Sequence, residues 1–232
     1  KGVPKDQARG IFAENNFWGR TLAAVSSSTD PSAYGGYGPK MPGFETIPYD
    51  DLKALENAVQ DENVAAFMVE PIQGEAGVVL PSDDYLGEAH RICKENNVLL
   101  IADEVQTGIG RTGSLLCSTG SSEFPCRPDI VVLGKALSGG VLPVSAVLAD
   151  DEIMLNIRPG EHGSTYGGNP LACSVATAAL NVLLDENMVE NARVMGKHFR
   201  SRLRELMNDE NGTIVTVRGR GLLNAIEIRP RE

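Results

Sequence analysis

The chain has 232 residues, of which 42% are hydrophobic and 22% charged, and its formal net charge is −10. This length can bury the core of one large domain, or of one domain and part of another. No apolar run is long enough to cross a membrane. The acidic balance, with no local basic cluster, argues against nucleic acids and anionic membranes as partners. An anionic small molecule would have to be bound by individually placed arginines.

Short apolar runs alternate with amphipathic helical patterns along most of the chain. Such alternation is typical of a parallel sheet covered by helices on both faces. The sequence therefore predicts an α/β fold with three layers (αβα), in which a mostly parallel sheet lies between two layers of helices. The predicted strands are 11–13, 64–69, 98–102, 130–133 and 144–148, and the predicted helices are 51–59, 83–96, 169–184 and 187–207.

Two stretches fall outside this alternation. Residues 26–44 are rich in Ser, Gly, Pro and Tyr without a regular period, which predicts a long ordered loop of the kind that often builds an active site. Residues 213–217 and 222–228 are patterned as a strand pair. We expect residues 1–210 to form a large domain, and residues 211–232 to form either a terminal strand pair or the start of a smaller domain.

The four cysteines show no spacing typical of a metal site, and a chain of this length does not need disulfides for stability. We therefore predict reduced thiols in an intracellular protein of the cytoplasm or the mitochondrial matrix. Cys117 and Cys126 flank a polar segment, so a local disulfide or redox role is the alternative to two unpaired loop cysteines.

Neither a dinucleotide site nor a metal site is predicted. Residues 108–113 match the glycine fingerprint of dinucleotide-binding proteins, but residues 114–128 contain glycine, serines and two prolines where that fingerprint requires a helix. The three histidines are scattered along the chain. Asp103 and Glu104 form an acidic pair, but no further ligands are suitably spaced near them.

Two charged residues, Asp103 and Lys135, stand at the ends of two predicted apolar strands. Because the carboxyl ends of parallel strands meet at one edge of a sheet, where ligands bind, we expect the two side chains to share a site. A lysine can form a Schiff base with an aldehyde cofactor, and a carboxylate can hold a protonated pyridine nitrogen. This pair predicts pyridoxal phosphate chemistry, with strand-end capping by Asp103 as the alternative.

Three further segments have both a functional and a purely structural interpretation. Residues 70–77 follow an apolar strand and place Glu75 at the same edge, or they form a solvated turn. Residues 17–21 combine the only tryptophan with an arginine, which fits a stacking platform with a carboxylate clamp, or core packing beside a surface charge. Residues 163–170 place hydroxyls and amides before a helix start, which fits an anion site or a simple cap.

Taken together, these motifs resemble the class III (ω-amino acid) aminotransferases across essentially all 232 residues. The segments that carry the resemblance are Asn16-Phe-Trp-Gly-Arg-Thr21, Glu70-Pro-Ile-Gln-Gly-Glu75, Ile101-Ala-Asp-Glu-Val-Gln-Thr-Gly108, Gly134-Lys-Ala-Leu-Ser-Gly-Gly140 and His162-Gly-Ser-Thr-Tyr-Gly-Gly-Asn-Pro170.

The resemblance implies the large domain of the fold-type I, aspartate aminotransferase-like transferases, which depend on pyridoxal phosphate. It implies that Lys135 holds the cofactor and then moves a proton between carbon and nitrogen. Asp103 would keep the pyridine nitrogen protonated, and Gln106 would bond the ring hydroxyl. Phe17 and Val105 would pack against the two faces of the ring.

The resemblance also implies residues for the substrate and for a partner subunit. Arg20, beside Trp18, would bind a substrate carboxylate. Glu75 would pair with an arginine of the small C-terminal domain and release it for the second substrate. Ser164 and Thr165 would reach the cofactor phosphate of the neighbouring subunit, which implies a homodimer with shared active sites.

The implied reaction moves the terminal amino group of an ω-amino acid to 2-oxoglutarate, giving glutamate. Residues 26–31, 38–44 and 143–148 are most similar to family members that act on ornithine, whereas acetylornithine enzymes usually carry histidine where Trp18 stands. The alternatives are an enzyme for acetylornithine or 4-aminobutyrate, or an inactive cofactor-binding fragment.

The family's N-terminal part, which carries the phosphate cradle, and the rest of its small domain are not in this chain. The chain also begins at Lys1 without an initiator methionine. We therefore expect a segment of a longer protein, with a large domain that is incomplete on its N-terminal side, and we expect the activity to belong to the longer protein.

Overall fold

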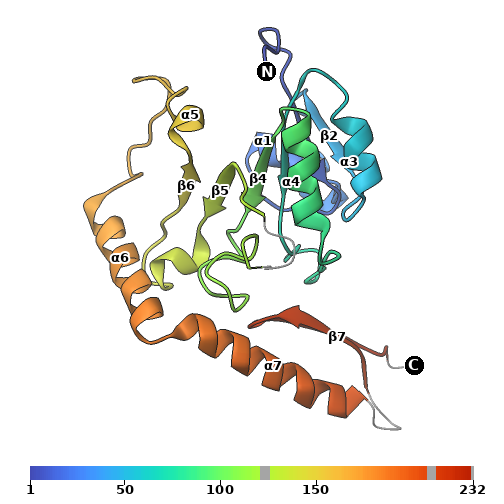
Figure 1. Ribbon diagram of the computed structural model, residues 1–232, viewed down its shortest axis with the longest axis vertical. Helices are drawn as coiled ribbons and strands as arrows, with labels where there is room; N and C mark the ends of the chain where they lie inside the picture. The colour runs from blue at the N-terminus through green and yellow to red at the C-terminus, as the bar shows by residue number, and fades with distance from the viewer. Residues whose placement is uncertain (121–125, 208–212, 231–232) are drawn as a thin grey trace. The chain divides into compact units, whose positions relative to one another are not determined.

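The computed structural model describes residues 1–120, 126–207 and 213–230 (Figure 1). The chain forms two compact units. The first unit comprises Lys1–Asp103 and Ser121–Ile130, and the second comprises Glu104–Gly120 and Val131–Glu232. The domain boundary expected between residues 210 and 211 lies outside the described residues.

A parallel sheet organises the first unit. Each of its three strand pairs is parallel, which confirms the predicted sheet type. Successive parallel strands need long crossover connections, and helices provide most of them here. In spatial order the strands are β2 (Phe44–Ile47), β1 (Arg9–Ala13), β3 (Val64–Val69) and β4 (Leu99–Asp103).

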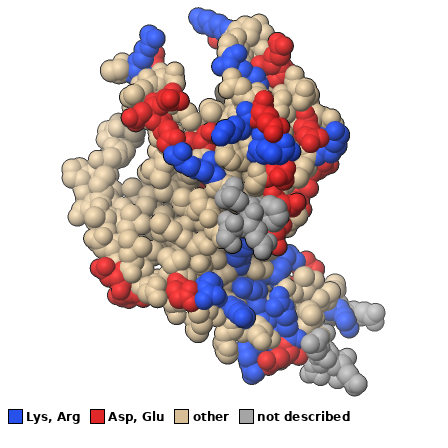
Figure 2. Space-filling view, viewed as in Figure 1, with Lys and Arg blue, Asp and Glu red and all other residues tan. Residues whose placement is uncertain are grey.

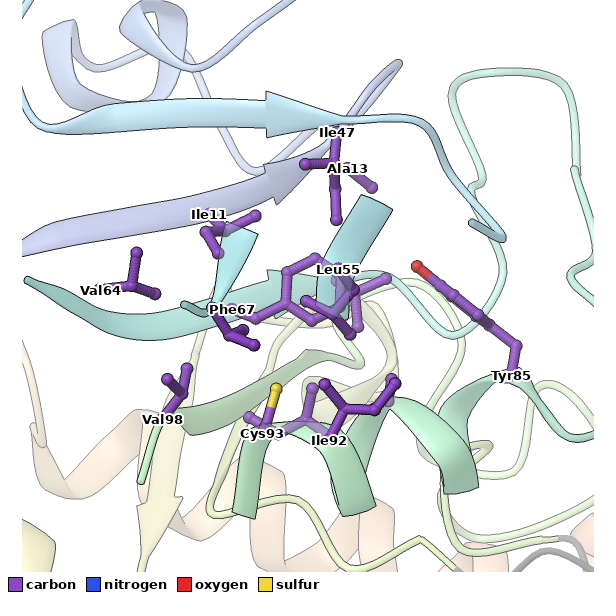
Figure 3. Close-up of a cluster of buried hydrophobic side chains, with 14 of the residues drawn as sticks. Ile11, Ala13, Ile47, Leu55, Val64, Phe67, Tyr85, Ile92, Cys93 and Val98 are labelled. Carbon is purple, nitrogen blue, oxygen red and sulfur yellow. The ribbon is translucent and has the colours of Figure 1, made fainter. Parts of the chain in front are cut away.

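Two helices cover the core of the first unit. α3 (Leu52–Ala58) begins where the Asp51 side chain accepts a hydrogen bond from the Ala54 amide, and α4 (Tyr85–Glu95) follows the predicted amphipathic pattern. Figure 3 shows Leu55 of α3 lying against Phe67 of β3, with side chains of α4 below them. Fully burying one such side chain contributes about 1.5–3 kcal/mol, so this cluster fixes how the helices sit on the sheet.

The loop expected at residues 26–44 is more regular than the sequence pattern indicated. It includes α2 (Pro31–Tyr34) and follows α1 (Leu22–Ser26). Asp30 caps α2 by accepting from the Ser32 amide at 2.9 Å, and Pro31 suits the first helical turn. These helices are shorter than the window in which periodicity can be recognised, so the prediction of an irregular loop was only partly correct.

The second unit contains the two long predicted helices and the predicted strand pair. α6 and α7 occupy the expected regions, and β7 and β8 pair as an antiparallel hairpin. A small apolar cluster joins β5, η1 and α6. The elements are β5 (Ile130–Leu133), the 3-10 helix η1 (Lys135–Ser138), β6 (Ala146–Ala149), α5 (Asp151–Met154), α6 (Pro170–Asp185), α7 (Met188–Met207), β7 (Ile214–Arg220) and β8 (Leu223–Ile228).

The hairpin and α7 lie side by side (Figure 1) and approach one another at a glycine. A Cβ atom on Gly196 would lie 1.8 Å from the carbonyl oxygen of Gly221, so only glycine fits there. Arg200 of α7 donates from Nη1 to that carbonyl and to Asn224 Oδ1, each at 2.7 Å. The Leu222 amide donates to the Arg111 carbonyl at 2.9 Å, which ties the hairpin to residues 104–120 as well.

Acidic and basic side chains lie intermixed at the upper right of Figure 2, over the first unit. On α4, for example, Arg91 pairs with Glu88 and Glu95 at 2.8 Å. Exposed pairs of this kind contribute about 0–1 kcal/mol each, so apolar packing rather than charge holds the fold. Within the described residues, no helix combines the length and apolar character needed to cross a bilayer.

Candidate active site

Asp103 is the last residue of β4 and is buried, with 6% of its surface exposed. It lines a small pocket of the first unit together with residues from the end of β3 and the loop after β1. Burying a carboxylate is costly unless it is paired or hydrogen-bonded. The pocket residues are Phe12, Asn16, Phe17, Trp18, Met68, Val69, Glu70 and Asp103.

Asn16 brings an unsatisfied polar atom to this pocket. Its Nδ2 donates to the carbonyls of Ala13 and Ser27 at 2.8 and 2.9 Å, while its Oδ1 is buried without a described hydrogen-bond partner. Buried polar atoms in native proteins are nearly always satisfied. The pocket therefore presents an acceptor in addition to the Asp103 carboxylate.

Lys135 follows β5 in an unusual backbone conformation. Its φ is 42°, in the left-handed region that non-glycine residues rarely adopt, and such a conformation costs of order 1–3 kcal/mol. η1 begins at this residue, and the buried side chains of Leu137 and Ser138 anchor the turn. The side chain of Lys135 is exposed. The fold thus holds a strained lysine at the end of an apolar strand.

Within the second unit, the residues that follow β4 lie beside the end of β5. The Glu104 amide donates to the Val132 carbonyl at 2.9 Å. A Cβ atom on Gly134 would lie 3.3 Å from a methyl group of Val105, so glycine allows this close approach. Val105 and Gln106, which follows it in the chain, are both half-buried. Asp103 belongs to the first unit and Lys135 to the second, and each lies at the carboxyl end of its strand.

The segment 17–21 is tied to the end of β3 in the first unit. The Phe17 amide donates to Glu70 Oε1 at 2.9 Å, and the Arg20 guanidinium lies 5.2 Å from the centre of the Phe17 ring. Trp18 stacks on Phe12 with ring centres 5.3 Å apart. The predicted stacking residue, the predicted clamp and the only tryptophan therefore come together here.

Glu75 lies in a tight turn after β3 and is exposed. The Gly74 amide donates to Glu70 Oε2 at 3.2 Å, and Gln73 exchanges backbone hydrogen bonds with Val79. The Gln73 side chain also donates to the Glu14 carbonyl at 2.7 Å. These bonds fix the base of the turn that presents Glu75.

Ser164 and Thr165 lie on an exposed stretch before α6. Ser164 Oγ accepts from the Gly167 amide at 2.9 Å, and Asn169 caps α6 by accepting from the Ala172 amide. The capping role that the sequence offered as an alternative therefore belongs to Asn169. Both Ser164 and Thr165 are exposed.

The sequence interpretation missed the roles of two buried glutamates. Glu70 directly follows β3 and is 8% exposed, and Glu104 directly follows β4 and is fully buried. Each accepts hydrogen bonds from a loop next to the site. The sequence feature that drew attention to Asp103, a carboxylate at the end of an apolar strand, could have revealed both glutamates.

Residues 108–113 form consecutive turns and not the helix start that a dinucleotide fingerprint requires, in agreement with the predicted loop. All four cysteines are free, and only Cys173 is exposed. Burial raises the pKa of Cys93 to about 12 and that of Cys117 to about 11. Burial and a raised pKa both disfavour the reactive thiolate.

Comparisons with known proteins give a consistent family. Residues 3–232 match the family model described as Aminotransferase class-III. The chain is 62% identical over 229 residues to the mitochondrial ornithine aminotransferase of Rattus norvegicus, a match that covers 99% of this chain and 51% of that protein. The chain therefore spans about half the length of the curated relatives it matches.

Solved structures of aminotransferases resemble this chain as well. The ornithine aminotransferase of Toxoplasma gondii ME49 matches with a TM-score of 0.94 and 52% identity, over 98% of this chain and 53% of that one. A second structure of the T. gondii enzyme is described as showing partial occupancy of PLP at the active site. The acetylornithine aminotransferase of Elizabethkingia anophelis matches with a TM-score of 0.83 and 47% identity, over 99% and 53% of the two chains.

Replacing Glu70 with alanine should destabilise the first unit and disturb the tryptophan site. The amides of Phe17 and Gly74 would lose their acceptor, at about 1–3 kcal/mol for each unsatisfied group. Urea denaturation should show the loss, and Trp18 fluorescence should report the local change. Glu70→Gln keeps one acceptor oxygen and should lose less. The exposed Glu56→Ala serves as the control, and an equal stability for Glu70→Ala and Glu56→Ala would contradict this role.

Thiol reactivity should separate one cysteine from the other three. At pH 8 a thiol with a pKa of about 11 is ionised to about one part in a thousand, and the reactive fraction rises as the pH approaches that pKa. In the folded chain we expect the disulfide reagent DTNB to modify Cys173 rapidly, with the remaining three thiols reacting after unfolding. Rapid reaction of two or more thiols in the folded chain would contradict this expectation.

Proposed function

The chain belongs to the class-III aminotransferase family, and from this premise we propose that the protein containing it transfers the δ-amino group of L-ornithine to 2-oxoglutarate. Ornithine becomes glutamate semialdehyde, which cyclises to pyrroline-5-carboxylate, and 2-oxoglutarate becomes glutamate. The 62% identity to the rat ornithine enzyme supports this substrate. An enzyme for acetylornithine, supported by the E. anophelis structure, or for 4-aminobutyrate is the second candidate.

The packing of the segment after β4 supports the proposal. Within the second unit, the segment that follows β4 lies against the end of β5 and the glycine after it, through the bond from the Glu104 amide to the Val132 carbonyl and the contact between Val105 and Gly134. Asp103 immediately precedes this segment, and Lys135 immediately follows Gly134. Amino transfer requires an amine and a carboxylate, and Lys135 and Asp103 each lie at the carboxyl end of an apolar strand.

Class-III aminotransferases depend on pyridoxal phosphate, an aldehyde that takes up an amine and whose protonated pyridine ring draws electrons from the bond that breaks. The residues of this chain fit that cofactor. Lys135 supplies an amine, and Asp103 a buried carboxylate for a protonated ring nitrogen. The same pocket as Asp103 contains the Phe17 ring and the unsatisfied Asn16 Oδ1.

Each residue has a defined task in this proposal. Lys135 accepts and returns the proton exchanged at the substrate carbon that bears the amine. Asp103 holds positive charge at the ring nitrogen, which strengthens the pull on electrons. Gln106 hydrogen-bonds the ring hydroxyl. Phe17 and Val105 would pack against the cofactor ring and hold it in place.

Substrate recognition falls to residues beside this cluster. Arg20 binds a substrate carboxylate, a task suited to a guanidinium held over an aromatic ring, and Trp18 packs beside the substrate. Glu75 pairs with an arginine of the small domain while ornithine is bound. That pairing is released when 2-oxoglutarate enters, so the site can accept a second carboxylate.

The working enzyme is a homodimer, in which Ser164 and Thr165 of one subunit bind the cofactor phosphate of the other. Their exposed position before α6 supports this arrangement. Residues 1–210 form the cofactor-binding large domain, and residues 211–232 begin the small domain. The mitochondrial name of the rat relative favours the mitochondrial matrix over the cytoplasm.

Steady-state turnover of the longer protein tests the assignment. We expect a higher kcat/KM for ornithine than for acetylornithine or 4-aminobutyrate. Lys135→Ala should lower kcat by about 10²–10⁴-fold or more, because the proton-transfer group is lost. Lys197→Ala, an exposed lysine of α7, should leave kcat unchanged. A clear preference for the acetylated substrate, or a fully active Lys135→Ala variant, would refute the proposal.

A further inference from the structure

Glu104 is a fully buried carboxylate located between two residues proposed to contact the cofactor, Asp103 and Val105. Its Oε1 accepts from both the amide and the hydroxyl of Ser118, each at 2.7 Å. Its Oε2 accepts from the Thr107 hydroxyl. The side chain thus accepts three hydrogen bonds and is fully buried.

The hydrogen bonds compensate the cost of burying a charge. An ionised carboxylate without donors would be strongly destabilised in a buried position, whereas bonds from hydroxyls and an amide are the short, charge-assisted type. The donors are themselves buried, with Thr107 fully buried and Ser118 2% exposed. Glu104, Thr107 and Ser118 therefore form a built cluster inside the second unit.

The hydrogen bonds of this cluster close two loops of the chain, called here the short ring and the long ring, and the proposed cofactor contacts Val105 and Gln106 lie within them. The short ring runs from Glu104 to Thr107, and the Gly108 amide closes it again by donating to the Glu104 carbonyl at 2.9 Å. Val105 and Gln106 are the two residues inside it. The long ring extends to Ser118 and fixes the base of the turns 108–113.

The backbone around Glu104 also contacts β5 and the residue before Lys135. The Glu104 amide is bonded to Val132, and Val105 packs against Gly134, the residue before Lys135. A shift of Glu104 would therefore move Val105 and Gln106 and would alter the support of the lysine turn.

We propose that Glu104 is a positioning residue, whose buried carboxylate sets the placement of Val105 and Gln106 against the cofactor through its bonds to Thr107 and Ser118. The inference rests on the proposed function, since it assigns Glu104 a task toward the same cofactor. Glu104 itself touches neither the substrate nor the reacting atoms.

Glu104→Gln tests the role in the full-length protein. The Ser118 amide needs the remaining oxygen, so the new amide nitrogen faces the Thr107 hydroxyl, which must reverse from donor to acceptor, and the bond to a charged oxygen is lost. We expect the Kd for pyridoxal phosphate, titrated into the apoprotein, to rise about tenfold, as for one lost hydrogen bond to a charged group. The pH midpoint of the bound cofactor's visible absorbance should also shift, which a purely structural role would not cause.

Asp129→Asn is the matched control. The Asp129 carboxylate, like that of Glu104, accepts a hydrogen bond from a backbone amide: it accepts from the Leu100 amide at 2.7 Å, near the opposite end of β4. We expect it to lower the unfolding temperature while leaving the cofactor Kd and the pH midpoint unchanged. Equal changes in Kd for Asp129→Asn and Glu104→Gln would overturn the inference.

Substitutions at Thr107 keep the test informative if Glu104→Gln does not fold. Thr107→Val removes the hydroxyl at nearly constant shape and should raise Kd several-fold, whereas Thr107→Ser keeps the hydroxyl and should restore it. A wild-type Kd and pH midpoint in both Glu104→Gln and Thr107→Val would overturn the positioning role alone. A wild-type protein that does not bind pyridoxal phosphate would overturn the proposed function and this inference with it.

Discussion

Hydrogen bonds from loop amides and hydroxyls to carboxylates buried directly after parallel strands are the constraint on which the candidate site depends. Glu70 after β3 holds the amides of Phe17 and Gly74, and Glu104 after β4 holds Thr107 and Ser118. In a parallel sheet these strand ends face the same edge. The carboxylates thereby hold the loops that follow these strands.

The residues after β5 are shaped to pack against the segment that Glu104 holds. Gly134 has no side chain, so Val105 can approach the chain just before Lys135, and Lys135 accepts a left-handed conformation to begin η1. Apolar packing of Leu137 against α6 residues offsets the conformational cost. A lysine held in a left-handed conformation next to a glycine is costly to maintain, and the proposed amino transfer would give a reason for it.

Much of the fold was predictable from local pattern, because apolar runs such as 64–69 and long amphipathic helices such as α7 carry a strong period. The strand β2 and the helix α2 were not, because elements of four residues are specified by a cap or a neighbouring strand rather than by periodicity. Asp103 and Lys135 were visible as charges at strand ends. The network of Glu104 was not, because its donor Ser118 lies fourteen residues away and only folding brings them together.

The central claim is that Lys135 is the amine that carries the cofactor, and chemical trapping tests it most directly. Borohydride reduction of the longer protein loaded with pyridoxal phosphate would fix the cofactor covalently to the amine that holds it, and peptide mapping by mass spectrometry would locate it. We predict a single pyridoxyl group on Lys135. A label on another lysine, or a loaded protein that reduction leaves unlabelled, would contradict the account.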